Sequence, residues 1–229
     1  MISSHVMKSK TGHIIVAIDG PAGSGKSTVS KKIAEKLGLL YIDTGAMYRA
    51  LTLKAMREKL DLEDAEALIN LAHRTEIDLK GGSGPLKVLL DGEDVASYIR
   101  TPELTNNVKY IARVPGVRHE MVKLQQSIGL RQNAVLEGRD IGTVVFPDTP
   151  YKFYLDADVA ERASRRHKEL TESGEAVDLE ILKKDVVARD ESDMKRSVGA
   201  LKKARDAIVI DTTNLSIDEV VEKVLGYIK

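Results

Sequence analysis

The chain of 229 residues contains no cysteine. This absence excludes a disulfide framework and a thiolate metal site, and it suits the reducing cytoplasm, where we expect the protein to act. No apolar run approaches the roughly 20 residues that span a bilayer, and no secretory signal pattern is present. The formal net charge is zero, so nothing draws the whole chain to nucleic acid or to an anionic membrane. We expect small-molecule partners rather than nucleic acid or a membrane, and we expect a monomer.

Several catalytic and binding patterns are also missing. No Ser-His-Asp or Cys-His constellation is visible, so the sequence gives no sign of a nucleophilic triad. A nucleotide-switch GTPase needs a guanine-reading Asn-Lys-x-Asp, which is absent, and no basic–aromatic interleaving supports a nucleic-acid-binding module. The histidines are scattered and lack the spacing of a metal site. They are His5, His13, His73, His119 and His167.

A glycine-rich segment at residues 20–27 fits the pattern Gly-x-x-x-x-Gly-Lys-Ser. It follows an apolar run at residues 14–18, typical of a parallel strand buried on both faces, and it precedes apolar residues at helical spacing. This order of strand, loop and helix places backbone N–H groups and a helix N-terminus around phosphate oxygens. Lys26 provides charge for the outer phosphates, and the Ser27 hydroxyl reaches Mg²⁺ that is held by phosphates and water. The alternative is a glycine-rich turn that binds nothing.

Five short apolar runs, including the one before the loop, alternate with helical patterns. This alternation predicts an α/β fold of the P-loop NTPase type, with five parallel strands flanked by helices on both faces. Ligands of such sheets bind beyond the carboxyl ends of the strands, where this chain repeatedly has polar residues. Asp19, at the end of the first run, either caps the strand or supports the Mg²⁺ site. The other four runs are residues 39–42, 134–136, 151–155 and 207–210.

Residues 70–128 interrupt the alternation and predict an α+β insert. Residues 76–80 and 86–90 indicate a hairpin, Asp91-Gly92 indicates a second turn, and Thr101-Pro102 opens a helix. The insert is large for a phosphate-loop domain, which favours a lobe for a second substrate, with a structural excursion as the alternative. The remaining predicted parts are a disordered leader at 1–12, the P-loop core at 13–69, 129–157 and 201–229, and a lid at 158–200.

The predicted lid contains two helical patterns separated by a polar, glycine-containing break. Capping boxes are predicted at residues 158–161 and 216–219, the latter opening the last helix. A helical hairpin lined with arginine suits a lid that closes over phosphates and excludes water. A solvated face laced by salt bridges explains the same spacing equally well. The charged residues that share a helix face are Arg162, Arg165 and Arg166 in the first pattern and Arg189, Asp193 and Arg196 in the second.

Two further segments are highly specific: residues 41–49, Tyr-Ile-Asp-Thr-Gly-Ala-Met-Tyr-Arg, and residues 137–147, Glu-Gly-Arg-Asp-Ile-Gly-Thr-Val-Val-Phe-Pro. With the glycine-rich loop and the lid residues, they make the chain resemble bacterial-type cytidylate kinases over nearly its whole length from residue 14. The resemblance implies transfer of the γ-phosphoryl group of ATP, with Mg²⁺, to CMP or dCMP, giving CDP or dCDP and ADP. The alternative is a kinase for UMP or another nucleoside monophosphate, and a P-loop nucleotide-binding switch is a remote one.

The same resemblance implies eight residues around CMP. Cytosine offers an N4 amino donor and O2 and N3 acceptors, which complement a carboxylate and a guanidinium. The implied roles are Arg49, Arg139, Arg196 and Thr44 at the acceptor phosphate, Arg189 and Asp193 at the ribose, and Arg118 and Asp140 at the base. One departure is Lys109, where the family commonly has a serine that helps to recognise cytosine. This departure bears on the strength of the preference for CMP over UMP.

The resemblance also implies the residues that bind ATP and assist the transfer. Arginine grips phosphate oxygens with a planar fork and stabilises charge that develops on the transferring group. The implied ATP-binding residues are Gly20, Pro21, Ala22, Gly23, Ser24, Gly25, Lys26, Ser27, Thr28, Arg162 and Arg166, with Thr212 and Thr213 beside the adenine. The implied catalytic residues are Lys26, Arg139, Arg162, Arg166 and Arg189.

Overall fold

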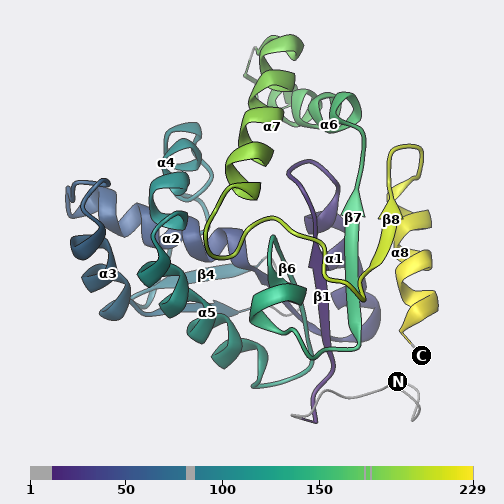
Figure 1. The fold of residues 1–229 in the computed structure, drawn as a ribbon, viewed down its shortest axis with the longest axis horizontal. Helices are drawn as coiled ribbons and strands as arrows, with labels where there is room; N and C mark the ends of the chain where they lie inside the picture. The colour runs from purple at the N-terminus through teal and green to yellow at the C-terminus, as the bar shows by residue number, and fades with distance from the viewer. Residues whose placement is uncertain (1–11, 81–85, 173, 176, 229) are drawn as a thin grey trace.

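The computed structural model describes residues 12–80, 86–172, 174–175 and 177–228. The predicted leader therefore lies outside the described residues except for its last residue. Five parallel strands form one sheet in the order β2-β6-β1-β7-β8, and helices cover both faces (Figure 1). The predicted P-loop-type α/β architecture is confirmed. The strands are β1 (Ile15–Asp19), β2 (Leu40–Asp43), β6 (Ala134–Gly138), β7 (Tyr151–Asp156) and β8 (Ile208–Asp211).

The central strand β1 is buried along its whole length, which explains its unbroken apolar sequence. Its residues alternate between two apolar clusters, one on each face of the sheet. Val16 and Ile18 pack with residues of α1 (Lys26–Leu37) and α8 (Ile217–Tyr227). Ile15 and Ala17 pack on the opposite face with residues of α2 (Thr44–Arg57) and α5 (Pro115–Gly129), among others.

The expected hairpin of the insert is present. Strands β3 (Ile77–Lys80) and β4 (Lys87–Leu90) pair antiparallel, and β5 (Glu93–Asp94) adds a third strand after the predicted turn at Asp91-Gly92. The residues between β3 and β4, 81–85, lie outside the described part of the chain. Thr101 caps α4 (Pro102–Ala112) as expected, because its hydroxyl accepts from the Leu104 N–H at 3.3 Å.

The insert does not have a core of its own. Ile77, Leu79, Val88 and Leu90 of its small sheet belong to the same apolar cluster as Ile15 and Ala17 of β1. The boundary that we predict between residues 69 and 70 lies inside α3 (Ala65–His73). The division into domains therefore stays a prediction, and packing ties the insert closely to one face of the central sheet.

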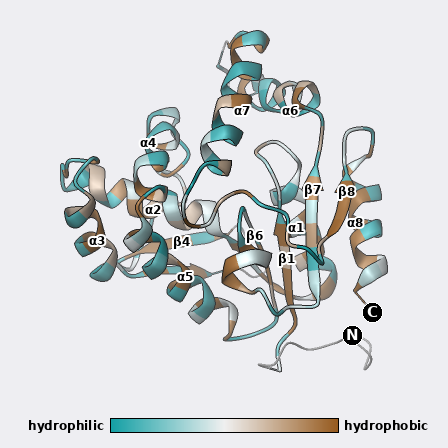
Figure 2. Ribbon diagram, in the orientation of Figure 1, coloured by the Kyte–Doolittle hydropathy of each residue, from teal (hydrophilic) through white to brown (hydrophobic). Residues whose placement is uncertain are grey.

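The predicted lid forms two packed helices, α6 (Val159–Glu172) and α7 (Leu179–Met194), beyond the carboxyl ends of the strands (Figure 1). Figure 2 shows them as mainly hydrophilic, in contrast to β1 and β8. The capping box expected at residues 158–161 is wrong. The Asp158 N–H donates to Thr213 Oγ1 at 3.0 Å, and the Glu161 carboxylate accepts from Arg165 Nε at 2.8 Å, so the two reciprocal bonds do not form.

A short π-helical turn, η1 (Ile141–Val145), follows β6 and carries the backbone past the end of β1. No helix in the described ranges is both long enough and apolar enough to cross a bilayer.

The predicted capping box of α8 is confirmed, and it allows a test of helix-end energetics far from the lid. Glu219 N–H donates to Ser216 Oγ at 3.3 Å, and Ser216 N–H donates to the Glu219 carboxylate at 2.8 Å. Replacing Ser216 by Ala should lower the free energy of unfolding by about 1 kcal/mol in urea titrations, because a helix-end N–H loses its acceptor. Ser216→Thr, which keeps the hydroxyl, should lose less than half as much. Equal losses in both variants would contradict the role of the hydroxyl.

Candidate active site

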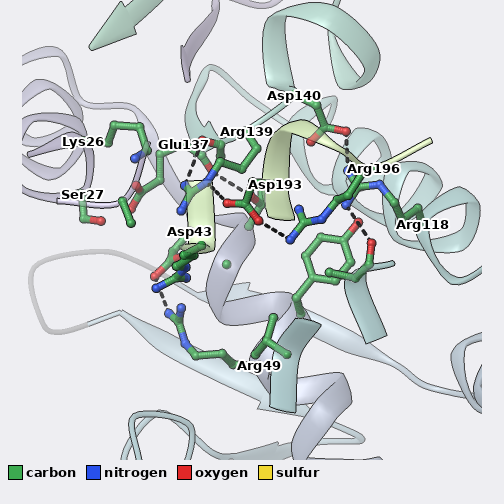
Figure 3. A pocket seen from close by; sticks show the side chains of 18 of the residues that line it. Lys26, Ser27, Asp43, Arg49, Arg118, Glu137, Arg139, Asp140, Asp193 and Arg196 are labelled. Carbon is green, nitrogen blue, oxygen red and sulfur yellow. Dashed lines mark hydrogen bonds and ion pairs between the residues drawn. The ribbon is translucent and has the colours of Figure 1, made fainter. Parts of the chain in front are cut away.

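The carboxyl ends of β2 and β6 and the loop after β1 surround one cavity of about 230 Å³, which we call the central cavity (Figure 3). Six basic and four acidic side chains line it, so its lining carries an excess of positive charge that suits a polyanionic ligand. The lining residues are Ala22, Gly23, Lys26, Ser27, Asp43, Thr44, Gly45, Tyr48, Arg49, Val108, Ala112, Arg118, Glu137, Gly138, Arg139, Asp140, Arg189, Asp193 and Arg196.

The glycine-rich loop needs its glycines at particular points. Gly20, Gly23 and Gly25 have φ values of 148°, 78° and 84°, which side chains rarely allow. A Cβ atom on Gly20 would lie 2.0 Å from the Leu155 carbonyl oxygen, so only glycine lets the end of β1 pass the end of β7 so closely. The loop then delivers Lys26 and the exposed Ser27 as the first residues of α1. This is the geometry of an anion site at a helix N-terminus.

Carbonyl groups of the loop are held by side chains, one from the loop itself and three from elsewhere in the chain. Such bonds fix the loop in a shape whose N–H groups serve an anion. The two arginines that contribute come from α6, and the threonine comes from the segment after β8. The bonds are Ser24 Oγ to Pro21 O at 3.0 Å, Arg162 Nη1 to Ala22 O at 3.1 Å, Arg165 Nη1 to Gly23 O at 3.5 Å, and Thr212 Oγ1 to Ser24 O at 3.2 Å.

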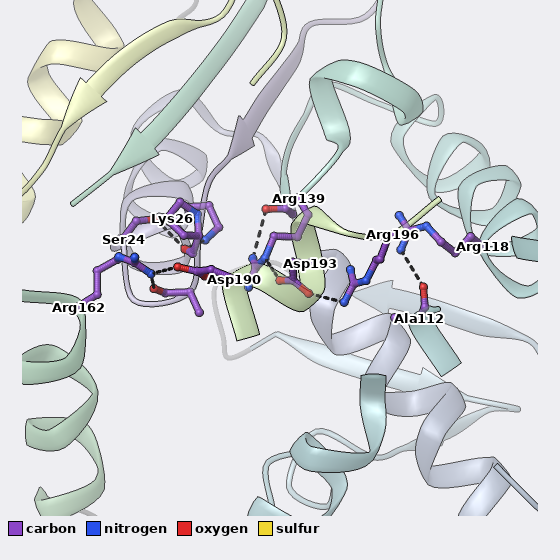
Figure 4. Close-up of polar contacts among 12 residues, drawn as sticks. Ser24, Lys26, Ala112, Arg118, Arg139, Arg162, Asp190, Asp193 and Arg196 are labelled. Atoms are coloured by element: carbon purple, nitrogen blue, oxygen red, sulfur yellow. Dashed lines mark hydrogen bonds and ion pairs between the residues drawn. The ribbon is translucent and has the colours of Figure 1, made fainter. Parts of the chain in front are cut away.

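Nine of the thirteen residues that the sequence assigns to ATP do not line the central cavity, and four of these nine, Arg162, Arg166, Thr212 and Thr213, lie outside the segment 20–28. Arg162 is buried, donates to the Ala157 carbonyl at 2.9 Å, and forms an ion pair of 2.6 Å with Asp190 of α7 (Figure 4). Arg166 pairs with Glu169 at 3.1 Å on the surface of α6. Thr212 and Thr213 contact the loop, Arg165, Asp158 and Asp211. The roles of these four residues toward ATP stay predictions.

All eight residues predicted around the acceptor line the central cavity. They come from four separate places: the start of α2, helix α5, the segment after β6, and α7 with the residues that follow it. Carboxylates hold the guanidinium groups in place (Figures 3 and 4). The pairs are Arg49–Asp43 at 3.0 Å, Arg139–Asp193 at 2.7 Å, Arg196–Asp193 and Arg118–Asp140. The Thr44 hydroxyl donates to the Glu137 carbonyl at 2.7 Å.

Asp193 is the centre of this charge network. Burial works to raise the pKa of Asp193, but the charges of Arg139 and Arg196 outweigh it and hold the pKa below its usual range. Arg189, one helical turn earlier, has no hydrogen-bond or ion-pair partner within the described ranges. Loss of water around it, and next the positive charge of Arg139, lower the pKa of Arg189 to about 10, although its side chain opens to the cavity. A cation so placed is available to an incoming anion.

Lys26 lies at the other side of the cavity from Arg118 (Figure 3). Its Nζ donates to the Pro21 carbonyl at 2.6 Å, and burial together with the nearby charge of Arg139 lowers the pKa of Lys26. A bound phosphate would reverse this shift, because its negative charge favours the ammonium form.

The Ser27 hydroxyl shares this side of the cavity with the carboxylates of Asp43 and Glu137, so oxygen atoms of the kind that Mg²⁺ prefers are present. No cluster of three or more potential ligands from His, Cys, Asp and Glu occurs in the described part of the chain. The donor set therefore fits a metal that is held mainly by phosphates and water, as the sequence predicts for Ser27.

Several site residues were not assigned a role from the sequence. Asp43 and Glu137 could have been found from their positions at strand ends, whereas Asp190 and Arg165 become visible only through the packing of α6 against α7 and the loop. For Tyr48, the sequence showed nothing that points to a role beyond its place in a family segment.

Lys109 does not line the cavity: it is exposed, with its Nζ 5.1 Å from the centroid of the Tyr110 ring. The apolar Val108 and Ala112 form that wall instead.

Asp19 holds the turn after β6, and its expected support of the Mg²⁺ site stays a prediction. Its buried carboxylate accepts hydrogen bonds from Ile141 N–H at 2.8 Å and Gly142 N–H at 2.7 Å. It thereby fixes η1, the turn directly after Arg139 and Asp140. Burial raises the pKa of Asp19 to about 6, against the opposing effect of these two bonds.

Comparison with known proteins gives a consistent result. The family model described as cytidylate kinase matches residues 16–229. A cytidylate kinase of Desulforamulus reducens is 52% identical, with 96% of this chain and 98% of that protein covered. Cytidylate kinases of Shouchella clausii and of Geobacillus sp. strain WCH70 are 52% and 51% identical, each with 93% of this chain and 95% of the relative covered.

The raised pKa of Asp19 predicts a pH dependence of stability. Between about pH 4 and pH 6 the folded protein holds a proton that the unfolded chain releases, so raising the pH through this window should lower the free energy of unfolding, by up to about 3 kcal/mol. Urea titrations of the parent chain and of Asp19→Asn across this range measure the effect as a difference. If the free energy of unfolding changes with pH equally in the parent chain and in Asp19→Asn, Asp19 does not titrate in this range.

Arg165 is predicted to support ATP binding without touching ATP. It donates to the Thr212 carbonyl at 2.6 Å and to Thr212 Oγ1 at 3.1 Å, and so connects α6 to the segment after β8 that holds the Ser24 carbonyl of the loop. Arg165→Ala should raise the dissociation constant for ATP about tenfold in calorimetric titrations, because the loop loses charge-assisted bonds. Lys168→Ala, an exposed change on the same helix, is the matched control and should bind ATP normally. Unchanged affinity in Arg165→Ala would exclude this role.

Proposed function

The chain belongs to the cytidylate kinase family, and we propose that it transfers the γ-phosphoryl group of ATP to CMP or dCMP, giving ADP and CDP or dCDP. One observation carries the assignment to this site. The eight residues expected around the acceptor, scattered between positions 44 and 196, line a single cavity together with Lys26 and Ser27 of the phosphate loop. Donor and acceptor phosphates can therefore meet within one cavity.

We propose that Arg49, Arg139 and Arg196 hold the phosphate of CMP. The three guanidinium groups enter the cavity from different elements and are already fixed by Asp43 and Asp193, so little side-chain freedom is lost on binding. The acceptor phosphate is anionic near neutral pH and attacks without a general base. This agrees with the absence of a nucleophilic triad, because positioning and charge neutralisation supply most of the catalysis in phosphoryl transfer.

For the nucleoside we propose contacts at the end of the cavity where the insert lies. Arg118 and Asp140 touch each other there, and both are buried. A carboxylate that accepts from the N4 amino group and a guanidinium that donates to O2 or N3 together match cytosine. Asp193 lies between this pair and Lys26 (Figure 4), and Arg189 lines the same cavity from the preceding turn of α7, which supports their proposed contact with the ribose.

On the donor side we propose that the loop amides and Lys26 bind the phosphates of ATP. Mg²⁺, held by phosphates, water and the Ser27 hydroxyl, would neutralise charge on the donor. Arg189 is a cation without a protein partner in the described ranges, and we assign it to the charge that develops on the transferring group. Arg162 and Arg166 would join it only after movement of α6, since both are engaged elsewhere in this structure.

All proposed contacts come from a single chain. Residues of the phosphate loop, of the expected acceptor site and of α7 line one cavity. We propose that the enzyme acts as a monomer, because one chain supplies this lining.

An acceptor panel tests the function. With ATP and Mg²⁺, kcat/KM for CMP and dCMP should exceed the values for UMP and AMP at least about fivefold, because uracil lacks the amino group that a carboxylate reads. Coupled detection of ADP measures the rates. If UMP or AMP proves the best acceptor, the assignment to cytidylate is wrong.

The variant Lys26→Ala tests the donor side of the site. It should suppress transfer to every acceptor by about 100-fold or more, because the outer phosphates lose their point charge. Wild-type rates in this variant would mean that the glycine-rich loop does not bind the donor.

A further inference from the structure

Tyr48 lines the central cavity and carries a buried hydroxyl that no described residue satisfies. It lies in α2, directly before Arg49, and only 7% of its surface is exposed. Its hydroxyl oxygen is buried without a hydrogen-bond partner among the described residues. Buried hydroxyl groups in folded proteins almost always have a partner, so an unpaired one on a residue that lines a ligand cavity points to the ligand.

The surroundings of Tyr48 fix its ring and leave its hydroxyl available. The guanidinium carbon of Arg118 lies 5.4 Å from the centroid of the Tyr48 ring, in a cation–π contact. Arg118 is itself held by Asp140 and by the Ala112 carbonyl at 3.4 Å. Burial raises the pKa of Tyr48, against the effect of the Arg118 charge, so the phenol keeps its proton and acts as a donor.

The nearby acceptors are already engaged. Asp140 accepts from Arg118, and Asp193 accepts from both Arg139 and Arg196. Neither carboxylate accepts from the Tyr48 hydroxyl in this structure, so the hydroxyl can donate to a substrate. The walls beside it are the apolar Val108 and Ala112, which suit the flat face of a base better than a phosphate.

We propose that Tyr48 is a specificity-determining residue, whose hydroxyl donates a hydrogen bond to the 2-carbonyl oxygen of the pyrimidine ring of the acceptor. The proposal rests on the proposed function, because it requires a nucleoside monophosphate in this cavity. Cytosine and uracil both carry the 2-carbonyl, whereas adenine has no carbonyl group. Tyr48 thus separates pyrimidines from adenine, while Arg118 and Asp140 separate cytosine from uracil.

Tyr48→Phe tests the proposal, because it removes the hydroxyl and keeps the ring over Arg118. We expect KM for CMP to rise about fivefold to tenfold, with kcat within about twofold of wild type and KM for ATP unchanged. The melting temperature without ligand should not fall, since an unsatisfied buried group has been removed, but the increase in melting temperature on adding CMP should shrink. A structural role would instead lower the unliganded melting temperature. Tyr110→Phe, the same change at a residue that does not line the cavity, is the control and should match wild type.

A substrate analogue gives the second arm and does not depend on the variant. In 2-thio-CMP the ring carbonyl is replaced by a thiocarbonyl, which is a weaker acceptor. The wild-type enzyme should prefer CMP to 2-thio-CMP several-fold in kcat/KM, and Tyr48→Phe should lose most of that preference. An unchanged KM for CMP in Tyr48→Phe, or an equal preference for CMP over the analogue in both enzymes, overturns the role of Tyr48. Failure of wild type to phosphorylate CMP at all would overturn the proposed function instead, so the two failures are distinguishable.

Discussion

Concentrating positive charge in a small space is the constraint on which this structure depends. The lining of the central cavity carries six cationic side chains, and without compensation they would repel one another and destabilise the fold. Carboxylates from three different elements reduce this repulsion: Asp43, Asp140 and Asp193 each hold one or two guanidinium groups at contact distance. Because each carboxylate also restricts the rotamers of its partners, the arrangement that keeps the cations together also aims them at a common point.

Helix α7 joins the two sides of this arrangement. Asp190 reaches Arg162, which holds the phosphate loop from outside, while Asp193 reaches Arg139 at the end of β6 (Figure 4). The two aspartates are three residues apart and so lie on one face of the helix. Arg189, on the preceding turn from Asp193, is left unpaired within the described ranges. One helix face is therefore linked through Arg162 to the glycine-rich loop and through Arg139 to the end of β6.

Much of the fold and of the candidate site was predictable from the sequence. The residues that were missed share one property: they act through partners that are distant in the sequence. The phosphate loop is encoded within a few consecutive residues, so strand, turn and helix signals identify it without any distant contact. The acceptor residues followed from the family segments rather than from periodicity. Arg165 and Asp190 act through partners far along the chain, and their positions on exposed-looking helices resemble those of ordinary surface charges. The capping box expected at residues 158–161 failed for the same reason, because Thr213 supplied a competing partner from another segment.

The distribution of apolar contacts determines which parts of the protein unfold together. The two large clusters unite the central sheet, α1, α2, α8 and the insert, but they contain no residue of α6 or α7. The sheet of the insert and the central strand should accordingly exchange their amide hydrogens as one cooperative unit. The helical pair stands outside that unit and is fastened chiefly by ion pairs and side-chain hydrogen bonds. Movement of this pair away from the cavity would break polar contacts such as Arg162–Asp190 and Arg139–Asp193 and leave the two apolar clusters intact.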